Sequence, residues 1–423
     1  MTLLDAAAPL AGYFDSPWPC EDGGPRRQAV GRGVRFASPT NGPLAMTARA
    51  AWMANMMVLR APGEVFLQGS TGPGPDTTGW IERIHSESLE VLARSPDLPA
   101  GGAWWPGSIA AHADGYLYAV QGRFVHKLDP QLRIVAAREL PRPDPYNGFI
   151  VMPDGRLVTK NFVQDGSVAS YFMAIDPARL EPTGAEVAVP EGSIARLSAD
   201  GDFVYVIGDH TAFRYAYAGG TLVRDEGWSR RYRTRPDAEQ SYGWDPVIAL
   251  DSVWFQDNGQ GVFGRSFRGG GVSTGPLHLH RIAVGDAGDH DAFAPFGIGH
   301  GTIANPPVID VARRIAVTYD SGNERIAGLR IDGPGRFTRL WEHTFGASNH
   351  FVLFPESGEV VVNDFDDDTG EQVVVLDVES GTERGRVAIG SPVQSVVFQA
   401  PGWAGDVYTC TFSTVARVYR RGY

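Results

Sequence analysis

Histidine, carboxylate and amine side chains are the groups in this sequence best suited to proton transfer. His350, in the segment SNHF, is the strongest candidate because it stands where a strand is expected to begin, with Asp364 in the next loop. A histidine with a pKa near neutrality exchanges protons readily, and an aspartate can orient it. We predict acid–base catalysis by His350 with Asp364 or Asp245, with His210 as a further candidate, and Lys160 either stabilising an oxyanion or pairing with an aspartate. The alternative is that His350 is merely hydrogen-bonded.

Aspartate and asparagine side chains in the loops suggest a second kind of chemistry, the binding of a hard divalent cation. Calcium and magnesium prefer such oxygen ligands. The acidic segment DFDDDTG is not an EF-hand loop, because the positions that need Gly and Glu hold Thr369 and Val375. One calcium or magnesium ion therefore remains a hypothesis. Its candidate ligands are Asp209, Asp257, Asp320 and Asn363.

Aromatic, arginine and amide side chains could form the walls of a small-molecule site. Ligand pockets combine apolar and aromatic walls with a few polar groups, and an arginine can clamp an anionic group. The alternative is that the tryptophans form a packed lid and the arginines lie on a solvated loop. The predicted substrate-binding residues are Asn55, Trp104, Trp105, Tyr146, Asn147, Arg231, Tyr242, Trp244, His300, Asn305 and Asn349.

Composition limits the classes of partner and compartment. The 423 residues carry a formal charge of −12, which argues against nucleic acid or an anionic membrane as a partner. Cys20 and Cys410 are the only cysteines, too few for a disulfide scaffold, and we expect both to be free thiols although a bridge is conceivable. The first residues lack a basic region and no apolar run is long enough to span a membrane, so we expect a cytoplasmic protein. Oligomeric state is left open.

The elements that must position these residues are short strands. Apolar runs of four to six residues recur between clusters of Gly, Asp, Pro and Asn, and long amphipathic helices are nearly absent. Turns such as PDG, ADG and ESGE place Gly where a tight hairpin needs a positive φ. Repeating units of roughly 40 to 60 residues are typical of propeller blades. They start at positions 55, 107, 147, 192, 244, 305, 349 and 392.

This layout resembles the β-propellers that include quinoprotein-like, gluconolactonase and strictosidine-synthase-like, and arylsulfotransferase-like repeats. The resemblance is architectural and covers most of the chain. It implies an all-β fold, which we predict as a single domain of eight four-stranded blades, with seven as the alternative. The last unit has only three strands, so residues 28–37, QAVGRGVRFA, are predicted to supply the fourth and close the ring, preceded by an extension over residues 1–27.

The predicted topology places the candidate residues at one end of a central channel. If each unit begins with its innermost strand, the strand starts and the loops between second and third strands share one face. Both are unusually polar, and buried polar groups need water, a metal ion or a ligand. Gluconolactonase-like propellers hold a divalent ion with a Glu, Asn and Asp set, of which this sequence offers no evident Glu.

These observations lead to a functional hypothesis and one alternative. We predict an enzyme of hydrolase, lyase or isomerase type that acts on a small, partly apolar organic substrate at the polar mouth of the channel. The alternative is a non-catalytic propeller that binds a ligand or another protein. A scaffold of that kind is expected to expose an apolar patch.

Overall fold

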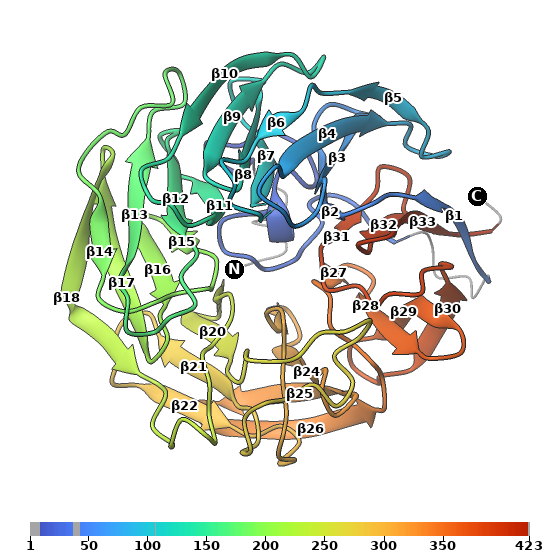
Figure 1. The fold of residues 1–423 in the computed structure, drawn as a ribbon. Coiled ribbons are helices and arrows are strands. Elements are labelled where there is room, and N and C mark those ends of the chain that lie inside the picture. The colour runs from blue at the N-terminus through green and yellow to red at the C-terminus, as the bar shows by residue number, and fades with distance from the viewer. Residues whose placement is uncertain (1–8, 37–42, 106, 422–423) are drawn as a thin grey trace.

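The computed structural model describes residues 9–36, 43–105 and 107–421. Its strands form eight sheets arranged in a ring around a central axis (Figure 1). The eight-bladed β-propeller predicted from the repeats is therefore confirmed, and the seven-bladed alternative is excluded. Each blade has four antiparallel strands in sequence order from the axis outward, except that the last blade takes its outermost strand from the N-terminal part of the chain.

The first four blades occupy residues 54–231. Blade 1 contains β2 (Ala54–Leu59), β3 (Val65–Ser70), β4 (Thr78–Ile84) and β5 (Val91–Arg94), with β6 (Leu98–Pro99) also paired to β4. Blade 2 contains β7 (Ser108–Ala111), β8 (Leu117–Gln121), β9 (Phe124–Leu128) and β10 (Ile134–Glu139). Blade 3 contains β11 (Tyr146–Val151), β12 (Leu157–Asn161), β13 (Ser170–Ile175) and β14 (Val187–Val189). Blade 4 contains β15 (Ser198–Asp200), β16 (Phe203–Ile207), β17 (Thr211–Ala218) and β18 (Thr221–Arg231).

The other four blades complete the ring. Blade 5 contains β19 (Val247–Ala249), β20 (Ser252–Gln256), β21 (Leu279–Ala283) and β22 (His290–Phe293). Blade 6 contains β23 (Val308–Asp310), β24 (Ile315–Asp320), β25 (Arg325–Gly333) and β26 (Arg336–His343). Blade 7 contains β27 (Val352–Phe354), β28 (Glu359–Asp366), β29 (Gly370–Asp377) and β30 (Glu383–Ala388). Blade 8 contains β31 (Gln399–Pro401), β32 (Val407–Cys410), β33 (Thr414–Arg420) and, outermost, β1 (Leu44–Ala50).

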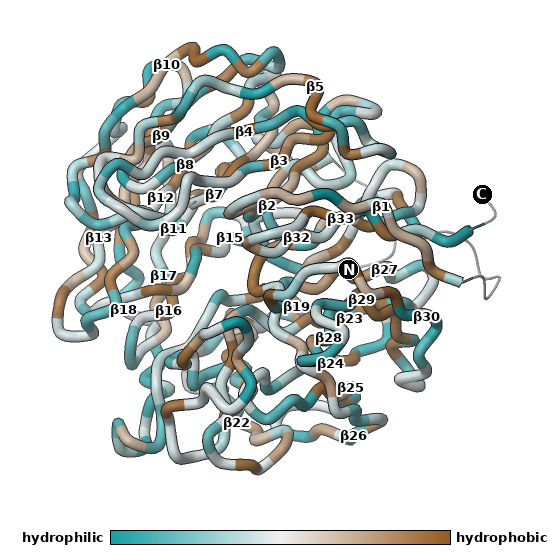
Figure 2. The backbone as a smooth tube through the Cα atoms, turned by 45° about the vertical axis from the view of Figure 1, so that its right-hand side comes forward, coloured by the Kyte–Doolittle hydropathy of each residue, from teal (hydrophilic) through white to brown (hydrophobic). Residues whose placement is uncertain are grey.

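The hydrophobic core lies between neighbouring blades. Inner strands such as β2 and β28 are almost fully buried, whereas outer strands such as β10 and β30 are largely exposed. Hydrophobic and hydrophilic stretches consequently alternate along the chain around the whole ring (Figure 2). The predicted hairpin turns are confirmed: Gly115 and Gly155, which follow Asp in the ADG and PDG turns, have φ values of 89° and 85°.

An N-terminal strand closes the ring, as predicted, but the residues that form it differ from the prediction. β1 pairs antiparallel with β33, from Leu44 opposite Arg420 to Ala50 opposite Thr414. Residues 28–36 do not join blade 8, and residue 37 lies outside the described residues. The outermost strand of a blade needs little apolar surface, so LAMTARA is sufficient there, while Val30 pairs with Leu353 of blade 7 and Phe36 is buried against Phe354.

Residues 9–36, here called the channel segment, run inside the ring instead of along its rim (Figure 1). The segment carries a short 3-10 turn, η2 (Glu21–Gly23). Its carbonyl groups accept hydrogen bonds from the inner edges of five innermost strands, which would otherwise leave buried N–H groups without a partner. These bonds run from the N–H groups of Leu59, Ala111, Ala199, Ile248 and Leu353 to the carbonyls of Trp18, Pro19, Pro25, Arg26 and Ala29, at 2.7 to 2.9 Å.

The two faces of the ring differ in what they expose. On one face, here called the start face, the chain enters the innermost strand of each blade. On the other, here called the turn face, lie the hairpins between first and second strands, such as those at Gly201 and Asp251. The channel segment carries charged side chains into the middle of the channel, between these two faces.

Candidate functional site

A buried histidine–aspartate pair occupies the centre of the channel. Nδ1 of His350 lies 2.8 Å from Oδ1 of Asp22, and the two residues are only 3% and 2% exposed. The imidazole stacks on the ring of Phe398 at a centroid distance of 3.7 Å, and the backbone N–H of His350 donates to the carbonyl of Val397. Since the ring is fixed on one face and hydrogen-bonded at one nitrogen, His350 has a defined orientation toward Asp22.

Arg27 compensates the charges that the channel segment brings into the channel. Its Nη1 lies 2.9 Å from Oδ2 of Asp22, its Nη2 forms an ion pair with Glu21, and its Nε donates to the carbonyl of Leu197 at 2.7 Å. Burial alone would raise the pKa of Asp22, but the charges and hydrogen bonds of His350 and Arg27 outweigh it and hold that pKa below its usual value. Asp22 is therefore ionised near neutral pH.

Asp245 and Arg196 extend this cluster toward blades 2 to 5. Oδ1 of Asp245 accepts from the Arg196 backbone N–H at 2.7 Å, and its Oδ2 lies 3.8 Å from Nε of Arg196 and 4.0 Å from Nη1 of Arg27. Nη1 of Arg196 binds Oε2 of Glu21 at 2.7 Å, and also the carbonyls of Gly107 and Asn147. Three buried carboxylates are thus interleaved with two guanidinium groups, which limits the cost of burying each charge.

A glycine makes room for this ion-pair network. Gly148 has a φ of 109°, and a Cβ atom there would lie 2.8 Å from Nη1 of Arg196 and 3.3 Å from Oε1 of Glu21. Both the backbone conformation and the close approach exclude a larger residue. The sequence NGF at the start of β11 is explained by this approach.

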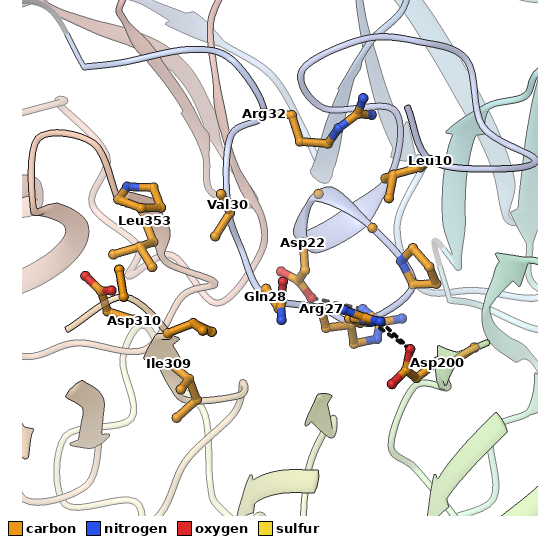
Figure 3. Close-up of a pocket in the computed structure, with 18 of the residues that line it drawn as sticks. Leu10, Asp22, Arg27, Gln28, Val30, Arg32, Asp200, Ile309, Asp310 and Leu353 are labelled. Carbon is orange, nitrogen blue, oxygen red and sulfur yellow. Dashed lines mark hydrogen bonds and ion pairs between the residues drawn. The ribbon is translucent and has the colours of Figure 1, made fainter. Parts of the chain in front are cut away.

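A cavity of about 700 Å³ opens on the turn face and reaches the network through the channel segment (Figure 3). Its lining includes Asp22 and Arg27, although the side chains of both are only 1% exposed, and His350 contacts Asp22. One side is apolar and the other is charged, with Arg26 and Asp200 forming an ion pair at 2.6 Å. The apolar side is formed by Val30, Ile309, Val311, Leu353 and Pro355.

A metal ion fits this cluster poorly on electrostatic grounds. Asp22, Asp245 and His350 each offer a ligand atom within 4.8 Å of the others, the one such group found among the described residues. Arg27, however, already contacts both carboxylates, and Arg196 contacts that of Asp245. A divalent ion would have to displace a buried guanidinium, so the donor set favours ion pairing over metal binding.

The four metal-ligand candidates from the sequence lie in four different blades. Asp209 pairs with Arg233 at 2.7 Å, and Asp257 contacts His280 at 3.1 Å. Asp320 accepts from the Thr302 N–H at 3.1 Å, and Asn363 from the Ser348 N–H at 2.8 Å. Each side chain stabilises a loop of its own blade, and the structure does not bring the four together.

The predicted catalytic residues are only partly assembled. Asp245 lies in the cluster with His350, but Asp364 does not: its Oδ2 pairs with Nη1 of Arg386 at 2.5 Å and its Oδ1 accepts from the Gly346 N–H. The expectation that Asp364 orients His350 is therefore wrong, because Arg386 on β30 neutralises Asp364 within blade 7. His210 pairs with Asp209 in blade 4, outside the cluster.

Lys160 lies at the end of β12 with its amine inside the channel. Nζ donates to the carbonyls of Ser193 at 2.7 Å and Asn161 at 3.0 Å. Burial lowers its pKa to about 7, although the charge of Asp245 raises it in part. The prediction of a carboxylate partner is not met by a direct contact, because the two bonded acceptors are backbone carbonyls.

Several predicted binding residues do gather on the start face. Nε1 of Trp105 donates to Oδ1 of Asn147 at 2.6 Å, and Trp105 stacks on Phe162. Nδ2 of Asn305 donates to the carbonyls of Ser348 and Val396. The Asn55 carbonyl accepts from the Phe398 N–H. These contacts link neighbouring blades around the mouth.

The remaining predicted binding residues differ in their surroundings. Trp104 donates to Oγ of Ser70, and Trp244 to the carbonyl of Gly259, beside Tyr242. The Asn349 side chain is buried with no hydrogen-bond partner among the described residues. Three residues lie away from the cluster: Tyr146 is in the hydrophobic core, and Arg231 and His300 are exposed.

Sequence reasoning missed the residues that complete the cluster. Glu21, Asp22 and Arg27 lie in the stretch EDGGPRR, for which the sequence predicts only an N-terminal extension, and Arg196 is not among the predicted site residues. The available signal is a group of acidic and basic residues between the apolar residues Trp18 and Ala29, both of which the structure buries. Charges between buried apolar residues indicate a paired, interior segment.

No protein-family model and no curated protein sequence matches the chain.

In the described part of the chain, no helix has the length and apolar character needed to cross a membrane. Cys20 and Cys410 are both free and buried, as expected.

Solved structures with the same architecture have very different roles. A europium-containing methanol dehydrogenase covers 96% of this chain and 90% of its own, with a TM-score of 0.65 and 8% identity. The Chaetomium thermophilum protein Sqt1, bound to the N-terminus of ribosomal protein L10, covers 92% and 98%, with a TM-score of 0.52 and 12% identity. The computationally designed Ika8 protein covers 87% and 96%, with a TM-score of 0.57 and 11% identity. At these identities the likeness shows a β-propeller, a fold shared by enzymes and by protein-binding proteins.

Proposed function

We propose that this propeller is an enzyme that acts by acid–base chemistry on a small, partly apolar organic molecule bound in the turn-face cavity. The reaction type that fits is hydrolysis, elimination or isomerisation. The observation that carries the proposal is that Asp22, a residue of the cavity lining with a nearly buried side chain, is hydrogen-bonded at 2.8 Å to the buried His350.

The size and lining of the cavity support a small-molecule ligand. Ligand sites commonly have volumes of about 300 to 1,000 Å³ and combine apolar walls with a few oriented polar groups. This cavity, of about 700 Å³, has Ile309 and Leu353 on one side and Asp22 with Arg27 on the other (Figure 3). An organic molecule with an apolar body and a hydroxyl or ammonium group would place the polar group at Asp22.

The chemistry of Asp22 supports a role as proton acceptor. The lowered pKa of Asp22 keeps its carboxylate ionised. The carboxylate accepts hydrogen bonds from His350 and Arg27, and it has lone pairs left for a substrate hydrogen. His350 holds the carboxylate in place from behind. Asp245, on the other side of Arg27, stabilises the guanidinium rather than the substrate.

A non-catalytic ligand-binding role is the second candidate, and one observation favours it. The same contacts that lower the pKa of Asp22 also weaken it as a base, because a lower pKa reduces the driving force for taking a proton. A stably ionised Asp22 would bind a cationic or hydroxyl group without changing it. Turnover distinguishes the two roles.

The test is a panel of lactones, aryl esters and hydroxy acids, measured for stabilisation of the protein in thermal shift and for turnover. For any compound that is turned over, Asp22→Asn is expected to lower kcat/KM by at least about 100-fold, the usual contribution of a positioned general base. Asp251→Asn is the matched control, because Asp251 lines the same cavity and has a φ of 52°, which asparagine tolerates.

The outcomes separate the hypotheses. Loss of turnover in Asp22→Asn that is still fully folded at the assay temperature, with full activity in Asp251→Asn, supports the enzyme. Full activity in Asp22→Asn removes Asp22 from the mechanism. A compound that stabilises the protein through Asp22 but is never converted favours the binding role.

A further inference from the structure

A second cavity adjoins the first on the turn face. It has a volume of about 380 Å³ and lies over the hairpin of blade 5 at Asp251, next to the cavity of about 700 Å³. Residues that line both cavities form the wall between them, so the two cavities are neighbouring compartments of one trough. The shared residues are Arg26, Gln28, Asp200, Asp251 and Val311.

An ion pair forms the part of this wall that joins the channel segment to blade 4. Nε and Nη2 of Arg26 lie 2.8 and 2.6 Å from Oδ1 of Asp200. The carbonyl of Arg26 accepts a hydrogen bond from the Ile248 N–H at 2.9 Å, which fixes the backbone of Arg26 against blade 5. The side chains of Arg26 and Asp200 are 43% and 30% exposed, so the pair keeps contact with solvent between the two compartments.

Apolar residues line both compartments, and the ion pair lies between them. Ile309 and Leu353 line the first compartment on the side opposite Asp200 (Figure 3). Ile248 and Val284 line the second compartment. An apolar ligand that used both would have to cover the ion pair and remove its water, which is unfavourable because no new hydrogen bond replaces that water. The pair therefore stops an apolar chain, whereas a hydroxyl or amide group could bond to it.

We propose that the Arg26–Asp200 ion pair determines specificity by limiting the apolar part of the substrate to the first compartment. The inference rests on the proposed function, because it concerns the ligand of the same cavity. An alkyl or aryl body that fills the first compartment binds, and a longer body gains no affinity from its further methylene groups. The substrate class is thereby narrowed to compact molecules whose apolar body ends, or carries a hydrogen-bonding group, where it meets the ion pair.

The experiment is isothermal titration calorimetry of the native protein and a double variant, Arg26→Ala with Asp200→Ala, using the 1-alkanols from butanol to decanol. In the native protein the association constant should rise about fourfold per methylene, as expected for burying one CH₂ group, and then level off. In the double variant the rise should continue, so that the alcohol two methylenes beyond the native limit binds about 16-fold more tightly than to the native protein. Loss of a partly exposed ion pair is expected to leave the fold intact, and Asp200→Ala alone breaks the pair if the double variant does not fold.

Two controls test whether the effect belongs to this wall. Arg32→Ala should keep the native chain-length limit, because Arg32 lines the first cavity but not the second. Arg26→Lys keeps a cation opposite Asp200 and should also keep the native limit.

The outcomes separate this inference from the proposed function. The inference alone is overturned if the native protein and the double variant show the same limit, if native affinity rises all the way to decanol, or if Arg32→Ala shifts the limit as far as the double variant does. In each case the alcohols still bind, so the cavity remains a ligand site. If no alcohol binds to the native protein or to any variant, the apolar cavity is not a ligand site and both proposals are overturned.

Discussion

Replacing Arg27 by methionine tests whether the charges of the channel segment are held by compensation. The substitution keeps an apolar side chain of similar length and removes a guanidinium that contacts Glu21, Asp22 and the carbonyl of Leu197. Arg196 would remain on Glu21, but Asp22 would keep only His350. The variant therefore leaves a buried carboxylate short of a partner.

The size of the effect follows from that unpaired charge. Removing one partner of a buried ion pair costs about 3 to 5 kcal/mol, because the remaining charge is neither solvated nor compensated. At about 2.1 cal/mol/K per residue, a chain of 423 residues has an unfolding entropy of about 0.9 kcal/mol/K. The melting temperature should therefore fall by about 3 to 6 °C.

Differential scanning calorimetry of the native protein and three variants measures this prediction. Arg26→Met is the control, because Arg26 is 43% exposed and its ion pair with Asp200 contributes at most about 1 kcal/mol, or about 1 °C. Adding Asp22→Asn to Arg27→Met should recover part of the loss by removing the uncompensated charge. If Arg27→Met melts within about 1 °C of the native protein, or no lower than Arg26→Met, the compensation argument is wrong.

Two further predictions concern Asp22 and Gly148. The folded pKa of Asp22 lies below its unfolded value of about 3.9, so its stabilising contribution is complete above that pH and is lost as the pH falls through the folded pKa. The difference in melting temperature between the native protein and Asp22→Asn should thus shrink from pH 6 to pH 2, and a constant difference would contradict it. Gly148→Ala should cost at least about 1 kcal/mol more than Gly63→Ala in denaturant unfolding, since both have positive φ but only at Gly148 does Cβ meet Arg196. Equal costs would show that the network tolerates the methyl group.

The repeat pattern was readable because each blade is a local structure. Strands, turns and their order are set by residues within one unit, and Gly115 and Gly155 mark hairpins whose φ values the structure confirms. Eight units therefore predicted eight blades. Closure joins the two ends of the chain, and local pattern did not distinguish residues 28–37 from Leu44–Ala50 as the outer strand of blade 8.

The functional centre depended on contacts that no local pattern contains. His350 was identified from its type and its place at a strand start, but its partner, Asp22, lies 328 positions away. Asp364, the nearer carboxylate, was the natural choice in the sequence and is neutralised by Arg386. Separation along the chain says little about which carboxylate reaches a given histidine once the blades have closed into a ring.

By itself the sequence determined an all-β repeat architecture with polar residues at the strand starts, because hydrophobic periodicity and turn residues act over a few positions. Only the tertiary structure decided that residues 9–36 lie in the channel, that Asp22 and Arg27 meet His350 and Asp245 there, and that the cavity opens on the turn face. The physical reason is that the inner edges of several innermost strands need hydrogen-bond partners and buried charges need opposite charges. Which chain segment meets these two needs depends on contacts that form only when the ring closes, and not on the residues next to that segment in the sequence.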